Sequence, residues 1–411
     1  MANIRPFKAI RPVRDKVHLM AAMPHYSYKR NVLRAILETN PFTFLNIIHP
    51  EFKSKVKTAA NSSARFEQIR GMYAEFMDKG YFIQEEDERL YVYRQTKNGH
   101  AFLGVIGGAS VQEYHEDKIK KHEATLTSRE AVFTNYLNIV GYNAEPVLLS
   151  YSGEAAIRNL MEEKIVERPE YEFTTTDLSK HELWVLSASE TQEMVKAFAK
   201  VKAIYIADGH HRSASSAGLH DLRSKQERKH YPNESHFLAF FVEEETLRIL
   251  EFNRMVKTLN GLSATEFLDA LKDSFEVRSL GRSKKPSGPH EITMCLENKW
   301  YQLNCKPHIV DADHPIKSLD AEILTQFVLD PILGIKDLKA DDNIDFISGN
   351  FGAGEISKRI RRGDFRIGFM LYPVSFEEVR KVADNQMTMP PKSTWVEPKL
   401  RSGLTIYHLN E

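Results

Sequence analysis

The sequence is poor in cysteine and has no surplus of charge of either sign. Its 411 residues include only two cysteines, Cys295 and Cys305, and 56 Lys and Arg stand against 56 Asp and Glu. Two cysteines cannot build the disulfide framework of a small secreted domain, which favours a reducing compartment. General nucleic-acid binders carry a basic surplus, which this chain lacks. We therefore expect no nucleic-acid partner.

Long apolar runs are also missing. No stretch approaches the roughly 18 to 20 apolar residues that a membrane-spanning helix needs, and residues 1–14 contain no apolar core of signal-peptide length. These absences predict a cytoplasmic protein with no membrane partner. The hydrophobic content of 42% is ordinary for a globular chain. Because 411 residues exceed one ordinary core, we expect more than one domain.

Two common site patterns are absent as well. No pair of histidines has the i, i+4 spacing with an intervening glutamate that marks a helical zinc site, and cysteine ligands are too few. A zinc enzyme is therefore not expected. The glycine-containing segment Gly349–Gly354 lacks the glycine-lysine-serine ending of a Walker phosphate loop.

Apolar strand patterns alternate with amphipathic helix patterns along the whole chain, which predicts an α+β or mixed α/β fold with mixed sheets. We predict an N-terminal α+β region over residues 1–150, a core over 151–260 and a C-terminal α+β region over 261–411. The expected strands include Phe42–Ile48, Leu90–Arg94 paired with Ala101–Ile106, Phe237–Val242 paired with Leu247–Arg254, and a hairpin of Glu291–Leu296 with Trp300–Cys305.

The most informative stretch is Ala203–Ser216. A short apolar run predicts a buried strand, Asp208-Gly209 predicts a tight turn, and a helix pattern follows. In this geometry free backbone N–H groups converge at the start of the helix, where anions bind. Asp208, His210, His211 and Arg212 all fall in this turn, a richer set than a structural turn requires.

Two other clusters combine cations with hydroxyl groups. The segment Lys120–Thr125 joins two lysines, His122 and Glu123, with the hydroxyl of Thr125 at its end. It is either a solvated helix start or a polyanion-binding patch whose Glu123 serves as a base or a metal ligand. In Met387–Thr394, two prolines fix a loop that presents Lys392, Ser393 and Thr394. That loop is either a connector to a last strand or a second anion contact.

Two motifs of this chain resemble an uncharacterised family of bacteria and archaea, the domain-of-unknown-function family 1015. They are Ile204–Arg212 and Met389–Thr394, and the resemblance covers essentially the whole chain. Further matches lie at Arg5–Ala9, Asn40–Leu45, Lys121–Thr125 and Pro398–Leu404. The chain departs from the family pattern at Met23–Ser27, where the family carries proline-proline-tyrosine-aspartate. It departs again at Asn253-Arg254, where the family carries a histidine before the arginine.

The Asp208–Arg212 turn also resembles the phosphate-binding turn of the ParB and sulfiredoxin superfamily, one branch of which phosphorylates free L-serine. The resemblance implies a ParB/sulfiredoxin-like core over residues 151–260. Sulfiredoxin chemistry needs a cysteine in the turn, where this chain has His210. Chromosome-partitioning ParB proteins carry helix-turn-helix DNA readers and a basic surplus, and this chain shows neither.

These resemblances lead us to expect a small-molecule kinase that uses ATP, ADP or pyrophosphate and a metabolite hydroxyl, with L-serine as the first choice of acceptor. The expected catalytic residues are Glu123 as general base, Asp208 as ligand of Mg²⁺ or another divalent cation, and His210 and His211, which would neutralise phosphoryl charge. The expected phosphate-binding residues are Gly209, His210, His211, Arg212, Ser213, Lys121 and His122, and the expected substrate-binding residues are Thr125, Lys392, Ser393 and Thr394.

Two other functions are compatible with the same turn. One is a non-catalytic nucleotide sensor, in which binding changes a partner interaction. The other is a phosphomonoester hydrolase, in which water replaces the metabolite hydroxyl. The partner in each enzyme case is a small-molecule substrate, and a homo-oligomer is compatible with the sequence.

Overall fold

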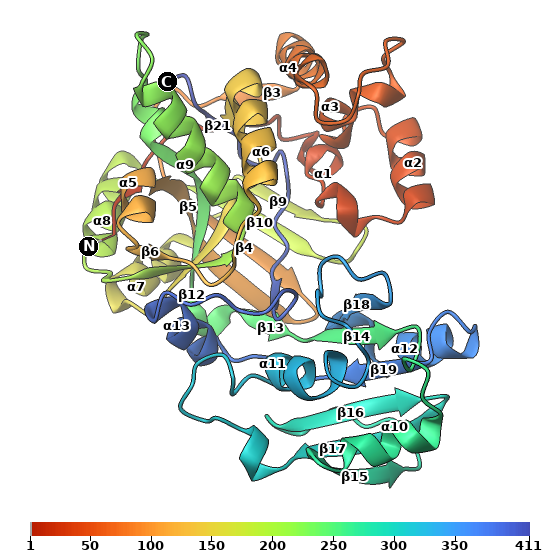
Figure 1. The fold of residues 1–411 in the computed structure, drawn as a ribbon. Coiled ribbons are helices and arrows are strands. Elements are labelled where there is room, and N and C mark those ends of the chain that lie inside the picture. The colour runs from red at the N-terminus through yellow and green to blue at the C-terminus, as the bar shows by residue number, and fades with distance from the viewer. Residues whose placement is uncertain (1) are drawn as a thin grey trace. The chain divides into compact units, whose positions relative to one another are not determined.

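The structure is a computed structural model that describes residues 2–411, and the chain in it forms two compact units (Figure 1). The first unit runs up to Lys121, continues over Thr125–Leu247 and ends with Pro398–Glu411; the second comprises Arg248–Glu397 and the short segment His122–Ala124. The predicted boundaries at residues 150 and 260 stay a prediction. Among the described residues no helix has the length and apolar character that crossing a membrane would require.

A mixed sheet forms the centre of the first unit, which confirms the predicted mixed α+β class. Its strand order is β6-β11-β8-β12-β5-β4-β10-β9, with β1 added to β5. The pairs β6/β11 and β8/β12 are parallel and the other pairs are antiparallel. The bounds are β1 Ile4–Arg5, β4 Tyr91–Lys97, β5 His100–Ser110, β6 Ile119–Lys120, β8 Val147–Tyr151, β9 Tyr171–Thr174, β10 Lys180–Val185, β11 Ile204–Asp208 and β12 His236–Glu243.

Both faces of this sheet are covered. Every residue of β12 is buried, as its unbroken apolar run predicts for a central strand. One face packs on α7 (Ala155–Lys164) and α8 (Ala188–Phe198) through Ile157, Met194 and Phe198. On the other face Leu400 and Leu404 of the C-terminal segment are buried and line a small cavity together with Phe240. Full burial of a large apolar side chain contributes about 2 kcal/mol, so the burial of these two leucines stabilises the position of the C-terminal segment.

The N-terminal part of the first unit adds a helical layer with its own core, in which Leu37, Phe44, Phe66 and Tyr142 are buried. Two short two-stranded sheets, β2/β3 and β7/β21, accompany it. The bounds are β2 Ile10–Pro12, α1 Val17–Met20, α2 Arg30–Thr39, α3 Leu45–Ile48, α4 Ser63–Asp78, β3 Phe82–Gln84, α5 Val111–His115, α6 Thr127–Val140, β7 Tyr142–Asn143, α9 His210–Ser224 and β21 Tyr407–His408.

An ion pair also fixes the C-terminal segment. Arg401, whose side chain is 3% exposed, donates to Asp177 Oδ1 at 2.6 Å and to Thr175 Oγ1 at 2.9 Å. Ser179 Oγ donates to the other oxygen of Asp177 at 3.0 Å. Burial by itself would raise the pKa of Asp177, but the hydrogen bond from Thr175 and the charge of Arg401 lower it from 3.8 to about 2.

This depressed pKa predicts a pH dependence of stability. A carboxyl with a lowered folded-state pKa stabilises the fold above its unfolded pKa of 3.8, and the stabilisation is lost as pH falls toward 2. We expect Asp177→Asn to cost about 2 kcal/mol of unfolding free energy at pH 6. The difference between variant and wild type should shrink between pH 4 and pH 2. Urea unfolding across this pH range measures it, and a difference that does not change with pH would contradict the assignment.

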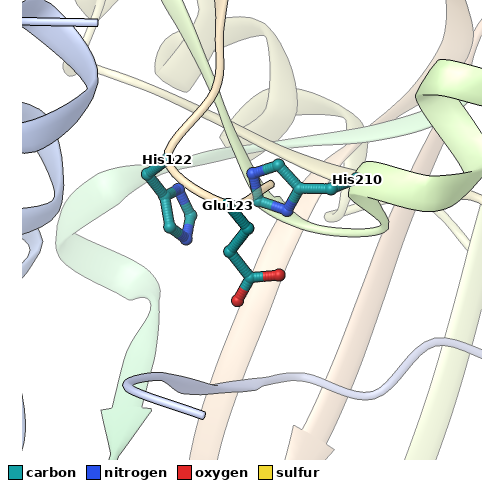
Figure 2. Close-up of side chains that lie close together, drawn as sticks. All are labelled: His122, Glu123 and His210. Carbon is teal, nitrogen blue, oxygen red and sulfur yellow. The ribbon is translucent and has the colours of Figure 1, made fainter. Parts of the chain in front are cut away.

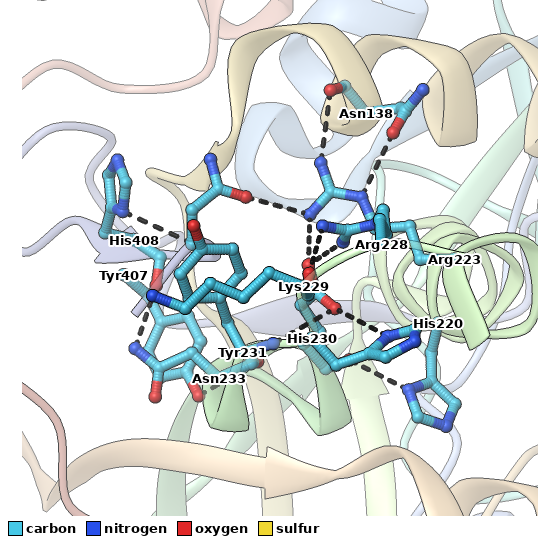
Figure 3. A network of polar contacts seen from close by, with 12 residues as sticks. Asn138, His220, Arg223, Arg228, Lys229, His230, Tyr231, Asn233, Tyr407 and His408 are labelled. Carbon is cyan, nitrogen blue, oxygen red and sulfur yellow. Dashed lines mark hydrogen bonds and ion pairs between the residues drawn. The ribbon is translucent and has the colours of Figure 1, made fainter. Parts of the chain in front are cut away.

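A buried polar network fixes the far end of α9 (Figure 3). Arg223 donates to Asn138 on α6 at 3.0 Å, to Glu234 at 2.9 Å and to Asn410 at 3.0 Å. Arg228 also pairs with Glu234, whose side chain is 5% exposed. The network ties α9, α6 and the last residues of the chain together, so the helix that begins at His210 has a fixed position.

The second unit is built on an antiparallel sheet with strand order β15-β17-β16-β19-β14-β18. Phe267, Ile323 and Phe369 belong to the core on one face, and Met255 and Ile356 to the core on the other. The predicted hairpin of residues 291–305 is confirmed as β16 and β17. The bounds are β13 Arg248–Leu250, β14 Phe252–Val256, α10 Ala264–Leu271, β15 Phe275–Leu280, β16 Glu291–Leu296, β17 Lys299–Cys305, α11 Asp320–Leu324, β18 Ile344–Ser348, α12 Gly352–Arg361, β19 Ile367–Met370, α13 Phe376–Asp384 and β20 Trp395–Glu397.

One expected strand and one expected strand pairing are wrong. The run Phe42–Ile48 contains the short helix α3 instead of a strand, because the Asn40 side chain accepts from the Phe42 N–H at 3.0 Å and turns the chain. The segment Leu247–Arg254 does not pair with Phe237–Val242. Both edges of β12 are already occupied by β5 and β8, and β13 and β14 pair with strands of the second unit.

Candidate functional site

The predicted strand, turn and helix around Asp208 are present. β11 ends at Asp208, Gly209 adopts φ of 107°, and α9 begins at His210. Only glycine adopts this left-handed backbone at low cost, which explains the residue at the turn. The first helical hydrogen bond runs from the Ser213 N–H to the Gly209 carbonyl at 3.0 Å. Gly209 has no side chain that could cap this end of α9, and the first turn of a helix is a favourable place for an anion.

Four charged side chains surround the turn. Asp208 accepts from Lys399 through Oδ1 and from Arg212 through Oδ2, each at 2.8 Å. Glu145 Oε1 lies 2.8 Å from Nη1 of Arg212, which also donates to the carbonyl of Pro146. Burial would raise the pKa of Asp208, but Lys399 and Arg212 lower it to about 2. The two negative charges of the carboxylates equal the two positive charges of Arg212 and Lys399, and Asp208 holds both cations in place.

Lys399 and Glu145 were not predicted as site residues. Lys399 lies 191 residues from Asp208 in the sequence, and Glu145 stands just before β8, which pairs with β11. The only sequence signal for Lys399 was the family-like segment Pro398–Leu404. No sequence pattern indicated Glu145 as a site residue, because a single glutamate before a strand is common.

His210 is buried and neutral. Its side chain is 4% exposed, and burial lowers its pKa to about 3 despite the nearby Asp208. A neutral imidazole serves as a hydrogen-bond partner or a metal ligand at neutral pH, but it carries no charge to offset that of a phosphoryl group. His211 is half-buried, and its carbonyl accepts from Ser215 Oγ at 2.6 Å. The catalytic role expected for His211 stays a prediction.

His122 and Glu123 come close to His210 (Figure 2). One ligand atom from each of the three side chains lies within 4.8 Å of the others. β6 runs parallel to β11 with Lys120 opposite Tyr205, so the two strands lead in the same direction toward His122 and His210. His122 and Glu123 follow Lys121 directly in the sequence, just after β6. Two imidazoles and a carboxylate at this spacing can hold a metal ion.

Lys121 and Thr125 flank this segment. The Lys121 ammonium donates to the Tyr114 carbonyl at 3.1 Å and lies 4.4 Å from the centre of the Tyr114 ring. Its charge is also one of those that lower the pKa of His210. Thr125 donates to Glu130 in the first turn of α6. The phosphate-binding role of Lys121 and the substrate-binding role of Thr125 stay predictions.

The loop with Lys392, Ser393 and Thr394 belongs to the second unit. Lys392 has φ of 58°, and its ammonium lies 5.2 Å from the ring centre of Phe252. Ser393 Oγ donates to the Pro390 carbonyl at 2.7 Å, and Ser393 and Thr394 are both buried. These contacts explain the shape of the loop within its own unit. Substrate binding by the three residues stays a prediction.

Comparisons with known proteins give one family and several solved structures. SbnI with a C-terminal truncation, from Staphylococcus aureus, is 12% identical to this chain. The superposition covers 71% of this chain and 82% of SbnI, with a TM-score of 0.38. A free serine kinase in complex with AMP is 15% identical, with 70% and 88% covered and a TM-score of 0.35. A conserved hypothetical protein from Pyrococcus furiosus is 16% identical, with 69% and 89% covered and a TM-score of 0.32.

No curated protein sequence matches this chain. A family model, described as "Protein of unknown function (DUF1015)", matches residues 4–322. The match covers more than half of the chain and confirms the resemblance carried by the sequence motifs. The chain therefore belongs to this family.

Proposed function

We propose that this protein binds a phosphorylated donor at the start of α9 and transfers its terminal phosphoryl group to the hydroxyl of a small metabolite. The supporting observation is the helix start that follows Gly209, next to two cations that Asp208 holds in place. Helix N-termini and fixed cations stabilise phosphate oxygens. The proposed donors are ATP, ADP and pyrophosphate, and the proposed acceptor is L-serine.

In this proposal each group has one task. The N–H groups of the first turn of α9 and the charges of Arg212 and Lys399 bind the donor phosphates. The acceptor hydroxyl attacks the terminal phosphorus, the bond from that phosphorus to the donor oxygen breaks, and Glu123 accepts the hydroxyl proton. Glu123 is exposed and close to His210, so an acceptor can approach it from solvent.

A divalent cation, when bound, would offset the negative charge of the donor phosphates. Asp208 fits its expected role as the ligand of such a cation poorly, because both of its oxygens already accept from Lys399 and Arg212. We therefore propose that Asp208 is a positioning residue for these two cations, and we assign no step to a cation at Asp208.

The test is a direct assay of phosphoryl transfer. Purified protein is incubated with L-serine, Mg²⁺ or Mn²⁺, and ATP, ADP or pyrophosphate, and O-phosphoserine is measured by mass spectrometry. We expect product with at least one donor and a fall in kcat of at least about 100-fold in Asp208→Asn, since misplacing charge that stabilises the transition state costs this much. Asp221→Asn, on the exposed side of α9, is the matched control and should retain the activity.

Measurements on the same purified protein distinguish the kinase from the nucleotide sensor and from the phosphomonoester hydrolase. A nucleotide that binds while no acceptor is consumed would identify a nucleotide sensor. Release of inorganic phosphate from phosphoserine would identify a hydrolase. Neither turnover nor binding of any of the three donors would refute the proposal altogether.

A further inference from the structure

We propose that His122, Glu123 and His210 bind one divalent transition-metal ion. His122 and Glu123 follow β6, and His210 begins α9 after the adjacent parallel strand β11. One ligand atom from each side chain lies within 4.8 Å of the others. Figure 2 shows the three side chains. This binding stands on the cluster alone and does not depend on the phosphoryl-transfer proposal.

The kind of ligand sets the class of metal. Mg²⁺ and Ca²⁺ prefer all-oxygen environments, whereas imidazole nitrogens favour Fe²⁺, Co²⁺, Ni²⁺ and Zn²⁺, and Mn²⁺ accepts a mixture of imidazole and carboxylate ligands. Two imidazoles with one carboxylate therefore select the second group. The sequence pattern of a helical zinc site, two histidines on one helix, is absent because these histidines lie on two separate segments.

The burial of the ligands indicates an open site instead of a structural one. His122 and His210 are 1% and 4% exposed, so their positions are fixed by packing, while Glu123 is exposed. Structural zinc sites close with four protein ligands, and catalytic sites keep a position for water or substrate. Three protein ligands with the carboxylate facing solvent match the second pattern. A carboxylate that gives one oxygen to the ion also keeps its second oxygen for a proton.

The cluster lies beside the proposed phosphate-binding turn. His210 is the first residue of α9, and Asp208 is two residues away with both oxygens engaged. An ion at His122, Glu123 and His210 would add positive charge at the start of α9 without displacing Arg212 or Lys399 from Asp208. The two groups of residues therefore form separate sites that can be tested separately.

The experiment measures metal binding without nucleotide or acceptor. Purified full-length protein is stripped with a chelator, and Zn²⁺, Mn²⁺ and Mg²⁺ are titrated by calorimetry, with stoichiometry checked by elemental analysis after dialysis. We expect one equivalent of Zn²⁺ or Mn²⁺ and no competition from equal Mg²⁺. Glu123→Gln should weaken binding at least tenfold and His122→Asn or His210→Asn still more, with folding verified by circular dichroism. His115→Asn, an exposed histidine outside the cluster, is the matched control.

A spectroscopic readout identifies the ligands. Co²⁺ added to the stripped protein should give visible absorption bands that Glu123→Gln alters and His115→Asn does not. Glu123 is exposed, so its variant should fold normally and keep the test decisive. Equal Zn²⁺ binding by Glu123→Gln, His122→Asn and wild type, or no Zn²⁺ or Mn²⁺ binding by folded wild type, would overturn the proposal. Neither result would bear on donor binding at Arg212 and Lys399, which calorimetry with ATP, ADP and pyrophosphate measures.

Discussion

Arg212→Ala is expected to weaken donor binding by about 10- to 100-fold and to lower kcat by at least about 100-fold. A charged hydrogen bond contributes about 1.5 to 3 kcal/mol to binding, and a donor to the transition-state charge accounts for about a hundredfold or more in rate. Arg212 also separates two carboxylates, since its Nη2 lies 2.8 Å from Asp208 and its Nη1 2.8 Å from Glu145. Without it these carboxylates lose their shared cation and would repel the donor phosphates.

Arg212→Lys is the informative second variant. Lysine keeps the positive charge, but a single ammonium cannot reproduce the planar fork that reaches Asp208, Glu145 and the Pro146 carbonyl together. We expect it to recover part of the binding and little of the turnover. Calorimetry with ATP, ADP and pyrophosphate measures the affinity, and the phosphoserine assay measures kcat.

The matched control for both Arg212 variants is Arg129→Ala, which removes an exposed arginine near the start of α6. Its donor affinity and kcat should equal those of wild type. If Arg212→Ala bound donor with wild-type affinity while remaining folded, the start of α9 would not be the phosphate site.

Glu234→Ala is expected to lower the free energy of unfolding by about 3 to 5 kcal/mol, the usual cost of breaking a buried ion pair. Glu234 accepts from Arg223 at 2.9 Å, and the side chains are 5% and 6% exposed. Arg223 would then remain buried without its carboxylate, and Arg228 would lose the same partner. Urea unfolding followed by circular dichroism measures the change.

Two further variants test the cause of this loss of unfolding free energy. Glu227→Ala removes an exposed carboxylate from the same loop, and its effect should stay within about 0.5 kcal/mol. The double variant Arg223→Met with Glu234→Leu removes both fully buried charges and should recover much of the stability, because only the partly exposed Arg228 then lacks its carboxylate. A single variant Glu234→Ala as stable as wild type would show that the network of Figure 3 does not stabilise the fold.

The parts of the fold that depend on local pattern could be predicted. The strand, turn and helix around Asp208-Gly209 follow from an apolar run, a glycine that adopts a positive φ and a helical pattern, all within about 20 residues. The predictions that failed required non-local information. Whether Leu247–Arg254 pairs with Phe237–Val242 depends on which strands already occupy the edges of β12, and no local pattern records this.

The sequence by itself therefore determined the turn and its residues, including Asp208, His210 and Arg212. Residues that are adjacent in the sequence are necessarily close together in a tight turn. Only the tertiary structure decided their partners. It brings Lys399 to Asp208 across 191 residues by packing the C-terminal segment on the sheet. It brings His122 to His210 through the parallel pairing of β6 and β11. Such contacts depend on strand order and on packing between distant segments, so local sequence patterns do not predict them.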